Sequence, residues 1–397
     1  MKQCFALALL LSFTRIHAQE FKVVGYLAAW NLNDCALQTD WDKLTHINIA
    51  FANPDADGNL HVYNTDIDAI VWLAHQHHVK VFISLAGGYL EPDWETAWNY
   101  WMQPDNRSAY IQKIVQFTLA HNLDGVDIDL EWQYVTDLYS PFVLELKNSL
   151  QLAGLSMTAA LPGGYRYPQI SSEALAAFDW VNLMIYDLTG PWAPQNPGQH
   201  SPIDWAQQCL QYWNEQGLPG NKQTLGVQFY GYDFASTPVQ GLDYQEIVAM
   251  DTAYAQLDQV GQLFYNGIPT IIAKTQMALQ QTSGVMIWEL GGDACGDLSE
   301  FSLLSAIDLT IQTSGDIQPA MEMPLYLYPN PVLDELTIGQ QENLQGLVRI
   351  TDLQGRLQWE GRVSAGQKID VHTLSTGIYL LHFQTDTQNR VKRFVKM

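Results

Sequence analysis

Residues 123–132 read LDGVDIDLEW, and from residue 126 onward aliphatic and acidic side chains alternate without a break up to Glu131. Successive side chains of a β-strand point to opposite faces, so this segment is predicted to be a strand with an acidic face and an aliphatic face. Asp127, Asp129 and Glu131 share the acidic face. The aliphatic face must pack under a covering layer, which places the three acids inside if the strand belongs to a closed parallel barrel.

Repulsion between the three carboxylates predicts their protonation. Adjacent carboxylates on one face lie about 6.6 Å apart, and each charged pair repels by roughly 2.5 kcal/mol at an effective dielectric near 20. At least one proton should stay bound at neutral pH, most usefully on Glu131, which lies nearest the barrel mouth and would act as a general acid. Asp124 has the opposite parity and, with Gly125, is expected to be structural.

Two other hypotheses fit an isolated D-x-D-x-E pattern. The first is the polar face of an exposed strand, but charges inside a barrel are costly unless they have a task, and the flanking pattern favours a barrel. The second is a magnesium or calcium site. Ligands spread along one extended strand converge poorly on a single ion, so no metal is expected.

The flanking sequence alternates strand-like and helix-like segments from residue 22 to about residue 313. Helical apolar spacing occurs in segments such as Asp66–His78, Arg107–Asn122 and Tyr139–Leu152. Eight β-branched or aliphatic runs are predicted as strands: Lys22–Leu27, Leu44–Phe51, Val79–Leu85, Gly125–Glu131, Ser156–Leu161, Trp180–Tyr186, Thr224–Tyr230 and Gly284–Glu289. Eight such units predict an α/β fold, a (β/α)8 TIM barrel over residues 19–313, with its chemistry at the carboxyl ends of the strands.

The amino-terminal residues 1–18 are predicted to be a signal peptide. Lys2 precedes an apolar run from Phe5 to Phe13, and Ile16-His17-Ala18 resembles a small-residue cleavage site. The run is too short to span a bilayer, so no membrane span is expected.

Composition limits the partners of the chain. The 397 residues include 42 acidic and 19 basic side chains, and a formal net charge of -23 would repel nucleic acid and anionic lipid surfaces. No nucleotide-binding loop, haem motif or metal-ligand cluster occurs, so no cofactor is expected. Cys35, Cys209 and Cys295 allow at most one disulfide in the mature chain, and we predict that they are small buried hydrophobes.

The carboxyl-terminal part differs from the rest in composition. Residues 314–324 are predicted to be a linker, and residues 325–397 a small antiparallel β-sandwich with strands at Gly346–Thr351, Arg356–Val363, Gly377–Gln384 and Arg390–Lys396 and a turn at Asp352–Gly355. Tyr328-Pro-Asn-Pro331, the sequence DLQGR, Leu374–Tyr379 and the basic end resemble the C-terminal sorting domain of the type IX secretion system. That resemblance implies an interaction with secretion machinery and a secreted or cell-surface location in a Gram-negative bacterium.

The larger part resembles glycoside hydrolase family 18, the chitinases and their relatives. DGVDIDLE at 124–131 matches the D-x-x-D-x-D-x-E signature of that family. Six further segments resemble family strands in the expected order: KVVGY at 22–26, THINIAF at 45–51, VFISLAGG at 81–88, MIYD at 184–187, FYG at 229–231 and GVMIWE at 284–289. The resemblance covers about residues 22–310.

The resemblance implies substrate-assisted, retaining cleavage of β-1,4-linked N-acetylglucosamine polymers. In that family the 2-acetamido group of the substrate replaces the protein nucleophile. Carried onto this chain, Glu131 is the general acid and base, Asp129 accepts the acetamide N–H, and Asp127 shares a proton with Asp129. Tyr186 donates to the acetamide oxygen. The substrate-binding residues implied are Trp288 as the sugar platform, with Asp187, Met184, Tyr26, Ser84 and Tyr230.

Departures from the family pattern and rival functions stay open at this point. Ala86 stands where the third-strand motif usually has its first glycine, and only about fifty residues separate Tyr232 from Gly284, which predicts a shallower cleft and endo-type cutting. One rival is an endo-β-N-acetylglucosaminidase acting on N-glycan cores, which needs the same acetamide. Another is a non-catalytic carbohydrate-binding lectin, although such proteins typically lose the proton donor.

Overall fold

A computed structural model describes residues 21–63, 65–315, 326–328, 332–339, 345–352, 356–364, 367–384 and 389–397. The chain divides into two compact units, Met1–Asp316 and Ile317–Met397, and each is treated by itself. The predicted signal peptide lies outside the described residues, as does the linker from residue 316 onward. The last helix of the first unit, α10 (Leu303–Gly315), includes the first two residues of the range predicted as linker.

The first unit is a closed barrel of eight parallel strands, which confirms the predicted (β/α)8 fold. The strands are β1 (Lys22–Ala28), β2 (His46–Pro54), β4 (Lys80–Gly87), β5 (Gly125–Leu130), β6 (Ser156–Pro162), β7 (Trp180–Met184), β8 (Gln223–Gln228) and β13 (Gly284–Trp288). Each pairs with its neighbour in parallel, and β1 closes the barrel by pairing with both β13 and β2. One assignment was wrong at its end: Tyr230 does not extend the barrel strand but opens a separate strand, β9 (Tyr230–Asp233).

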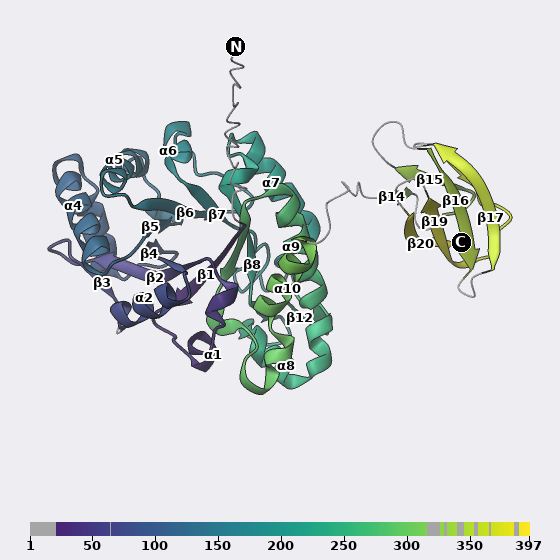
Figure 1. The fold of residues 1–397 in the computed structure, drawn as a ribbon, viewed down its shortest axis with the longest axis horizontal. Coiled ribbons are helices and arrows are strands. Elements are labelled where there is room, and N and C mark those ends of the chain that lie inside the picture. The colour runs from purple at the N-terminus through teal and green to yellow at the C-terminus, as the bar shows by residue number, and fades with distance from the viewer. Residues whose placement is uncertain are drawn as a thin grey trace, which may run out of the picture. The chain divides into compact units, whose positions relative to one another are not determined.

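Helices surround the strands and cover their aliphatic faces (Figure 1). They are α1 (Asp34–Leu37), α2 (Ile67–Gln76), α3 (Pro92–Trp101), α4 (Pro104–Ala120), α5 (Tyr139–Leu152), α6 (Ser172–Ala177), α7 (Ile203–Glu215) and α9 (Ile268–Gln281), together with α10. Local signals explain their limits: Asp66 and Ser171 cap α2 and α6, and proline opens α3 and α4. Asn122 and Gly154, expected at helix ends, both have positive φ.

The chain between β8 and β13 builds a small sheet over the barrel rim. Strands β10 (Gln240–Asp243), β9, β12 (Leu263–Phe264) and β11 (Gln259–Val260) pair antiparallel in that order, and helix α8 (Tyr244–Met250) follows β10. A further short strand, β3 (Leu60–Val62), forms a hairpin with β2. Sequence periodicity did not predict these elements. A strand of two to four residues contains too few alternating positions to be detected.

The second unit consists of two antiparallel sheets, as predicted for the tail. One contains β14 (Tyr326–Tyr328), β15 (Glu335–Gly339) and β18 (Lys368–Asp370), and the other contains β17 (Leu357–Ser364), β16 (Gln345–Asp352), β19 (Gly377–Gln384) and β20 (Asn389–Lys396). Its core contains Val348, Ile350, Leu381, Phe383 and Phe394. The predicted turn after Asp352 falls mostly on 353–355, outside the described residues. Within the described parts of both units, no helix has the length and apolar character needed to cross a bilayer.

The cysteine prediction was correct for one residue and wrong for two. Cys209 is buried and free, whereas Cys35 and Cys295 form a disulfide across a separation of 260 residues. Sequence spacing gave no indication of this pair, because the two cysteines approach one another only when β1 and β13 meet at the closure of the barrel.

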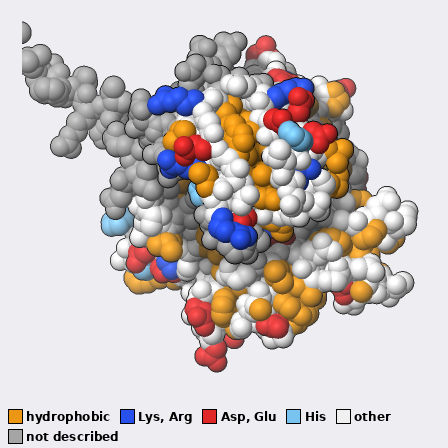
Figure 2. Space-filling view, turned by 90° about the vertical axis from the view of Figure 1, so that its right-hand side faces the viewer, with side chains coloured by type: hydrophobic (Ala, Val, Ile, Leu, Met, Phe, Trp, Pro, Cys, Tyr) orange, Lys and Arg blue, Asp and Glu red, His pale blue; other side chains and the backbone are white. Residues whose placement is uncertain are grey.

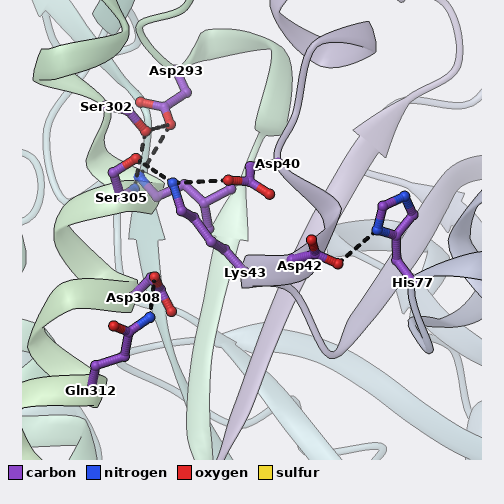
Figure 3. Close-up of polar contacts among 10 residues, drawn as sticks. Asp40, Asp42, Lys43, His77, Asp293, Ser302, Ser305, Asp308 and Gln312 are labelled. Carbon is purple, nitrogen blue, oxygen red and sulfur yellow. Dashed lines mark hydrogen bonds and ion pairs between the residues drawn. The ribbon is translucent and has the colours of Figure 1, made fainter.

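The loop after β13 is also fastened to α10 by polar contacts (Figure 3). Asp293 accepts hydrogen bonds from Ser302 Oγ at 2.7 Å and from the backbone N–H of Leu303 and Leu304 at the start of the helix. Lys43 reaches the same helix through Ser305 Oγ at 2.9 Å. These bonds hold the segment that follows Trp288 against the outer layer.

Candidate active site

The three acids of β5 lie as their parity predicts. Val126, Ile128 and Leu130 face outward into the main hydrophobic core. Asp127 and Asp129 are 0% and 3% exposed, whereas Glu131 follows the last residue of the strand and is only partly buried. The row therefore runs from the barrel interior to its mouth.

Asp127 is held by four side-chain donors from four neighbouring strands. Its Oδ2 accepts from Tyr26 Oη and Ser84 Oγ, each at 2.7 Å, and its Oδ1 accepts from Thr158 Oγ1 at 2.6 Å and Asn182 Nδ2 at 3.2 Å. Burial raises the pKa of Asp127 while these four bonds lower it. Two of these donors, Tyr26 and Ser84, were named from the family resemblance as substrate-binding residues, and the sequence analysis did not identify Thr158 and Asn182.

Asp129 lies between the other two acids with few partners. Its Oδ1 is buried and has no hydrogen-bond partner among the described residues. Burial, followed by the charges of Glu131 and Asp127, raises its pKa well above the usual value. The family resemblance implied that Asp127 and Asp129 share a proton. No hydrogen bond joins these two carboxyl groups in this structure, because other donors occupy both oxygens of Asp127.

Glu131 meets the requirement for a proton donor at neutral pH. Burial raises its pKa to about 7, and the charge of Asp187 contributes in the same direction. The loop after β4 leaves room for this carboxyl: a Cβ added at Gly88 would stand 2.6 Å from Glu131 Oε1. Ala86, where the family motif usually has glycine, has a φ of 90° and Gly87 has a φ of 100°. The turn thus keeps a left-handed backbone with alanine in the glycine position.

Aromatic side chains and methionines line the barrel beside these acids. Tyr186 follows β7, is buried, and directs its hydroxyl toward Met286 Sδ at 3.8 Å. Trp288 ends β13, and its ring lies 5.4 Å from that of Tyr26. Met184 and Trp288 are both partly buried and pack against the interior cluster that contains Tyr26 and Tyr186. These predicted residues therefore meet in one region.

Asp187 and Tyr230 extend this region toward the rim. Asp187 Oδ1 accepts from Tyr230 Oη at 2.5 Å and from Tyr232 Oη at 3.0 Å. A cavity of about 320 Å³ adjoins them, and its lining includes Trp288 and Glu289. The sequence analysis did not identify Tyr232. This residue lies on the same face of β9 as Tyr230, two positions further along the strand, so a prediction of β9 would have indicated it.

Asp124 and Gly125 have the structural positions expected of them. Asp124 Oδ2 accepts from the backbone N–H of Val81 at 2.8 Å and contacts His75 Nε2 at 2.9 Å, which ties the start of β4 to the segment before β5. A Cβ at Gly125 would stand 2.7 Å from the carbonyl oxygen of Ser156. Only glycine allows β5 and β6 to approach this closely.

Other tryptophans divide between core and surface. Trp98 is 2% exposed and donates to Asn53 Oδ1 at 2.7 Å. Trp30, Trp132 and Trp192 are 47%, 56% and 59% exposed. Trp30 lies 6.2 Å from Trp288 between ring centroids, so only Trp30 continues the predicted sugar platform through a direct aromatic contact. In the part of the chain that the structure describes, no three His, Cys, Asp or Glu side chains converge as metal ligands would.

A (β/α)8 barrel that carries a row of carboxylates to its mouth defines a protein of the glycosidase class. The matching family model is more specific. The chain belongs to glycosyl hydrolases family 18, whose model covers residues 22–293. The tail is a secretion system C-terminal sorting domain, matched over residues 326–397.

Solved structures of family members are similar over the barrel. A family 18 chitinase, ChiB from the chitin utilization locus of Flavobacterium johnsoniae, is 42% identical with a TM-score of 0.72, over 77% of this chain and 100% of that one. A chitinase from Bacteroides thetaiotaomicron is 33% identical with a TM-score of 0.66, over 75% and 99%.

Relatives known by sequence are more distant. A chitinase-like effector of Moniliophthora perniciosa is 28% identical over 255 residues, which is 54% of this chain and 56% of the effector. An endochitinase of Manduca sexta is 28% identical over 232 residues, which is 49% of this chain and 41% of that protein. The chain therefore spans about half the length of such relatives.

Proposed function

We propose that this chain is a chitinase that hydrolyses β-1,4-linked N-acetylglucosamine polymers with retention of configuration. The observation that carries the proposal is the row of acids in the barrel, with Glu131 at the mouth beyond the buried Asp129 and Asp127. Burial of Glu131 raises its pKa to about 7. An acid protonated at working pH, next to a site with unused hydrogen-bond acceptors, suits the cleavage of a glycoside that bears its own nucleophile.

The reaction would proceed in two steps. In the first, Glu131 gives its proton to the glycosidic oxygen while the acetamide oxygen of the sugar attacks the anomeric carbon, so the C–O bond breaks and an oxazolinium ion forms. Asp129, whose Oδ1 has no partner among the described residues, would accept the acetamide N–H and stabilise the developing positive charge. Tyr186 would donate to the acetamide oxygen. In the second step Glu131 takes a proton from water, which opens the ring with net retention.

Substrate binding would use the surfaces next to this row. The indole of Trp288 offers its face to the C–H groups of the distorted sugar, and Met184, Asp187 and Tyr230 would shape the walls. Between β8 and the barrel helix α9 the chain builds β9 to β12, α8 and one 3-10 turn at Thr252–Gln256, and this small rim supports endo-type cutting of an open chain. Release of dimers alone from one end would contradict that part of the proposal.

The proposed setting is outside the cell. The sorting domain at residues 326–397 supports export through the type IX secretion system to the medium or the cell surface. A disulfide between Cys35 and Cys295 suits an oxidising compartment. The polymer to be degraded is itself too large to enter a cell, so secretion and substrate agree.

The test is a product analysis with wild-type protein, Glu131→Gln and the control Glu173→Gln, whose exposed side chain lies on α6. Chito-oligosaccharides should yield shorter oligomers that first appear as the β anomer. Glu131→Gln should bind them but lose at least about a thousandfold in kcat, and the control should match wild type. Cleavage of an N-glycoprotein between its two core sugars, without chito-oligosaccharide cleavage, would identify the endo-β-N-acetylglucosaminidase instead. Binding without any turnover by wild type would identify a lectin.

A further inference from the structure

A buried polar group outside the expected site lies directly behind Asp187. His200 is 0% exposed, and its Nδ1 stands 3.5 Å from Asp187 Oδ1. Neither ring nitrogen forms a hydrogen bond of ordinary geometry with a described side chain. The imidazole packs against two tyrosine rings, with centroids 5.1 Å from Tyr230 and 4.9 Å from Tyr232, and these are the residues whose hydroxyls also donate to Asp187.

The turn that His200 contacts has a strained backbone. Asp187 has a φ of 65°, which is a left-handed conformation. For a residue other than glycine this conformation is unfavourable in free energy, and it persists only where the surroundings hold it. The same turn carries Tyr186 and Asp187, so its position sets two groups of the proposed active site. Because strand β7 ends before this turn, other contacts must hold the turn in place; we call these contacts the brace.

Residues 200 and 201 supply that brace from both sides of the turn. The carbonyl of His200 accepts from the backbone N–H of Leu188 at 2.9 Å, and Ser201 Oγ donates to the carbonyl of Ile185. Ser201 is fixed in turn by the fully buried Lys274, whose Nζ donates to it at 2.5 Å and to Asn266 Oδ1 at 2.7 Å. The brace thus continues down to helix α9.

We propose that His200 is a positioning residue for the hydrolysis reaction, acting from behind Asp187 to hold that carboxylate toward Glu131. The inference rests on the proposed function and deepens it. Neutral His200 would present Nδ1–H to Asp187 as a third donor beside the two tyrosine hydroxyls. Without this donor Asp187 would lose one of the three groups that hold it in place, and the negative charge that helps Glu131 keep its proton would move away.

The charged and titratable groups around His200 fix the direction of the expected effect. They are Asp187 from the turn, Tyr230 and Tyr232 from β9, and Lys274 from α9. Burial lowers the pKa of His200 more than the nearby Asp187 carboxylate raises it, and Lys274 adds a smaller lowering, so the neutral ring is favoured at neutral pH. Loss of its donor should therefore act on Glu131 through the position of Asp187 rather than through a lost positive charge.

The experiment compares wild type with His200→Phe and His200→Asn over a full pH–rate profile on a chito-oligosaccharide. Phenylalanine keeps the ring packing and removes the donor, whereas asparagine places an N–H close to the position of Nδ1. We expect His200→Phe to move the alkaline limb of kcat/KM by about half a pH unit or more toward acid, a loss of roughly twofold at the pH of the wild-type midpoint that approaches about threefold at higher pH. The change should appear in kcat with little change in KM, and His200→Asn should restore most of it.

Each outcome decides the proposal. The inference is overturned if a folded His200→Phe variant keeps the alkaline limb of kcat/KM at the wild-type pH, even with a lowered Tm. That result would mean that the ring only fills space. If His200→Phe does not fold, Tyr232→Phe removes another donor to Asp187 from a partly exposed position and should move the limb in the same direction. If wild type hydrolyses no N-acetylglucosamine polymer, the proposed function fails by itself. The pKa of Glu131, followed by carboxyl carbon NMR in wild type and His200→Asn or His200→Phe, then tests the positioning role without turnover.

Discussion

At the scale of single residues, Glu131 combines a cost in stability with a use in catalysis. The pKa of about 7 lies above that of a free glutamate, so the folded protein binds its proton more tightly than the unfolded chain does. The stabilisation from this site is fully present below the unfolded pKa near 4.5 and is lost as pH rises toward 7. Removing the ionisable group should therefore help the fold at high pH.

The first prediction follows from that linkage. Glu131→Gln should be more stable than wild type by about 3 kcal/mol at pH 8 and equal to it near pH 4, as denaturant titration at the two pH values would measure. In wild type, kcat/KM should fall about tenfold per pH unit above about pH 7, because only the protonated acid is active. A stability difference that does not change with pH would contradict the assigned protonation.

The second prediction concerns the space in front of Glu131. Gly88→Ala would put a methyl group 2.6 Å from the present position of Glu131 Oε1, so the carboxyl must move. Because the displaced atom ends a flexible side chain, stability should change by less than about 1 kcal/mol, whereas a misplaced acid should lower kcat by roughly 10- to 100-fold. Gly164→Ala is the matched control, since its Cβ would meet Trp205 at an ordinary 3.6 Å. Equal kcat in the two variants would show that the acid tolerates the shift.

At the scale of elements, alternation along one strand predicted which acids face the barrel interior, and the repeated pattern predicted the eight strands. The residues that hold Asp127 were harder to find. Thr158 and Asn182 donate to it from β6 and β7, and whether they reach it depends on the stagger between those strands and β5. Stagger is set by closure of the whole barrel, and no single strand contains that information.

A third prediction tests this cross-strand support. Thr158→Val keeps the shape of the side chain but removes the 2.6 Å bond to Asp127 Oδ1. The buried carboxylate then loses one of four donors, which should raise the pKa of Asp127 further and destabilise the protein by about 1–3 kcal/mol at pH 7. The loss should shrink at acid pH, because the missing bond matters most to the ionised carboxylate. Thermal unfolding of the two proteins at pH 4 and pH 8 gives the comparison, and an equal loss at both values would point to packing alone.

At the scale of the whole molecule, charge is divided unevenly between the two units. Residues 325–397 hold 8 of the 19 basic but only 7 of the 42 acidic side chains, so the first unit carries essentially all of the net charge of -23. On the face shown in Figure 2, basic, acidic and hydrophobic side chains are interspersed. The acidic unit suits a neutral polysaccharide and disfavours anionic partners, whereas the nearly neutral tail has its own role as a sorting domain.

Closure of the barrel joins the two ends of the first unit, and the disulfide secures that join. Cys35 follows β1, Cys295 follows β13, and a hydrogen bond of 2.9 Å from Asn33 Nδ2 to the carbonyl of Gly291 spans the same gap. Trp30 follows β1 and Trp288 ends β13, and the two rings contact one another at the mouth. The crosslink therefore stabilises both the fold and the aromatic surface beside Glu131.

The fourth prediction separates these two effects. Replacing Cys35 and Cys295 together by serine should lower the free energy of unfolding by about 2–5 kcal/mol, because a closed loop of this length strongly restricts the unfolded chain. Tm measured with and without a thiol reductant gives the same comparison in wild type, and Cys209→Ala, which removes only the buried free thiol, should keep the full sensitivity to reductant. Below the lowered Tm, a weakened contact between Trp30 and Trp288 should raise KM for long oligosaccharides more than for short ones. If KM is unchanged while Tm falls, the crosslink serves the fold alone, and the outer aromatic surface is held by Asn33 and the loop contacts of Asp293.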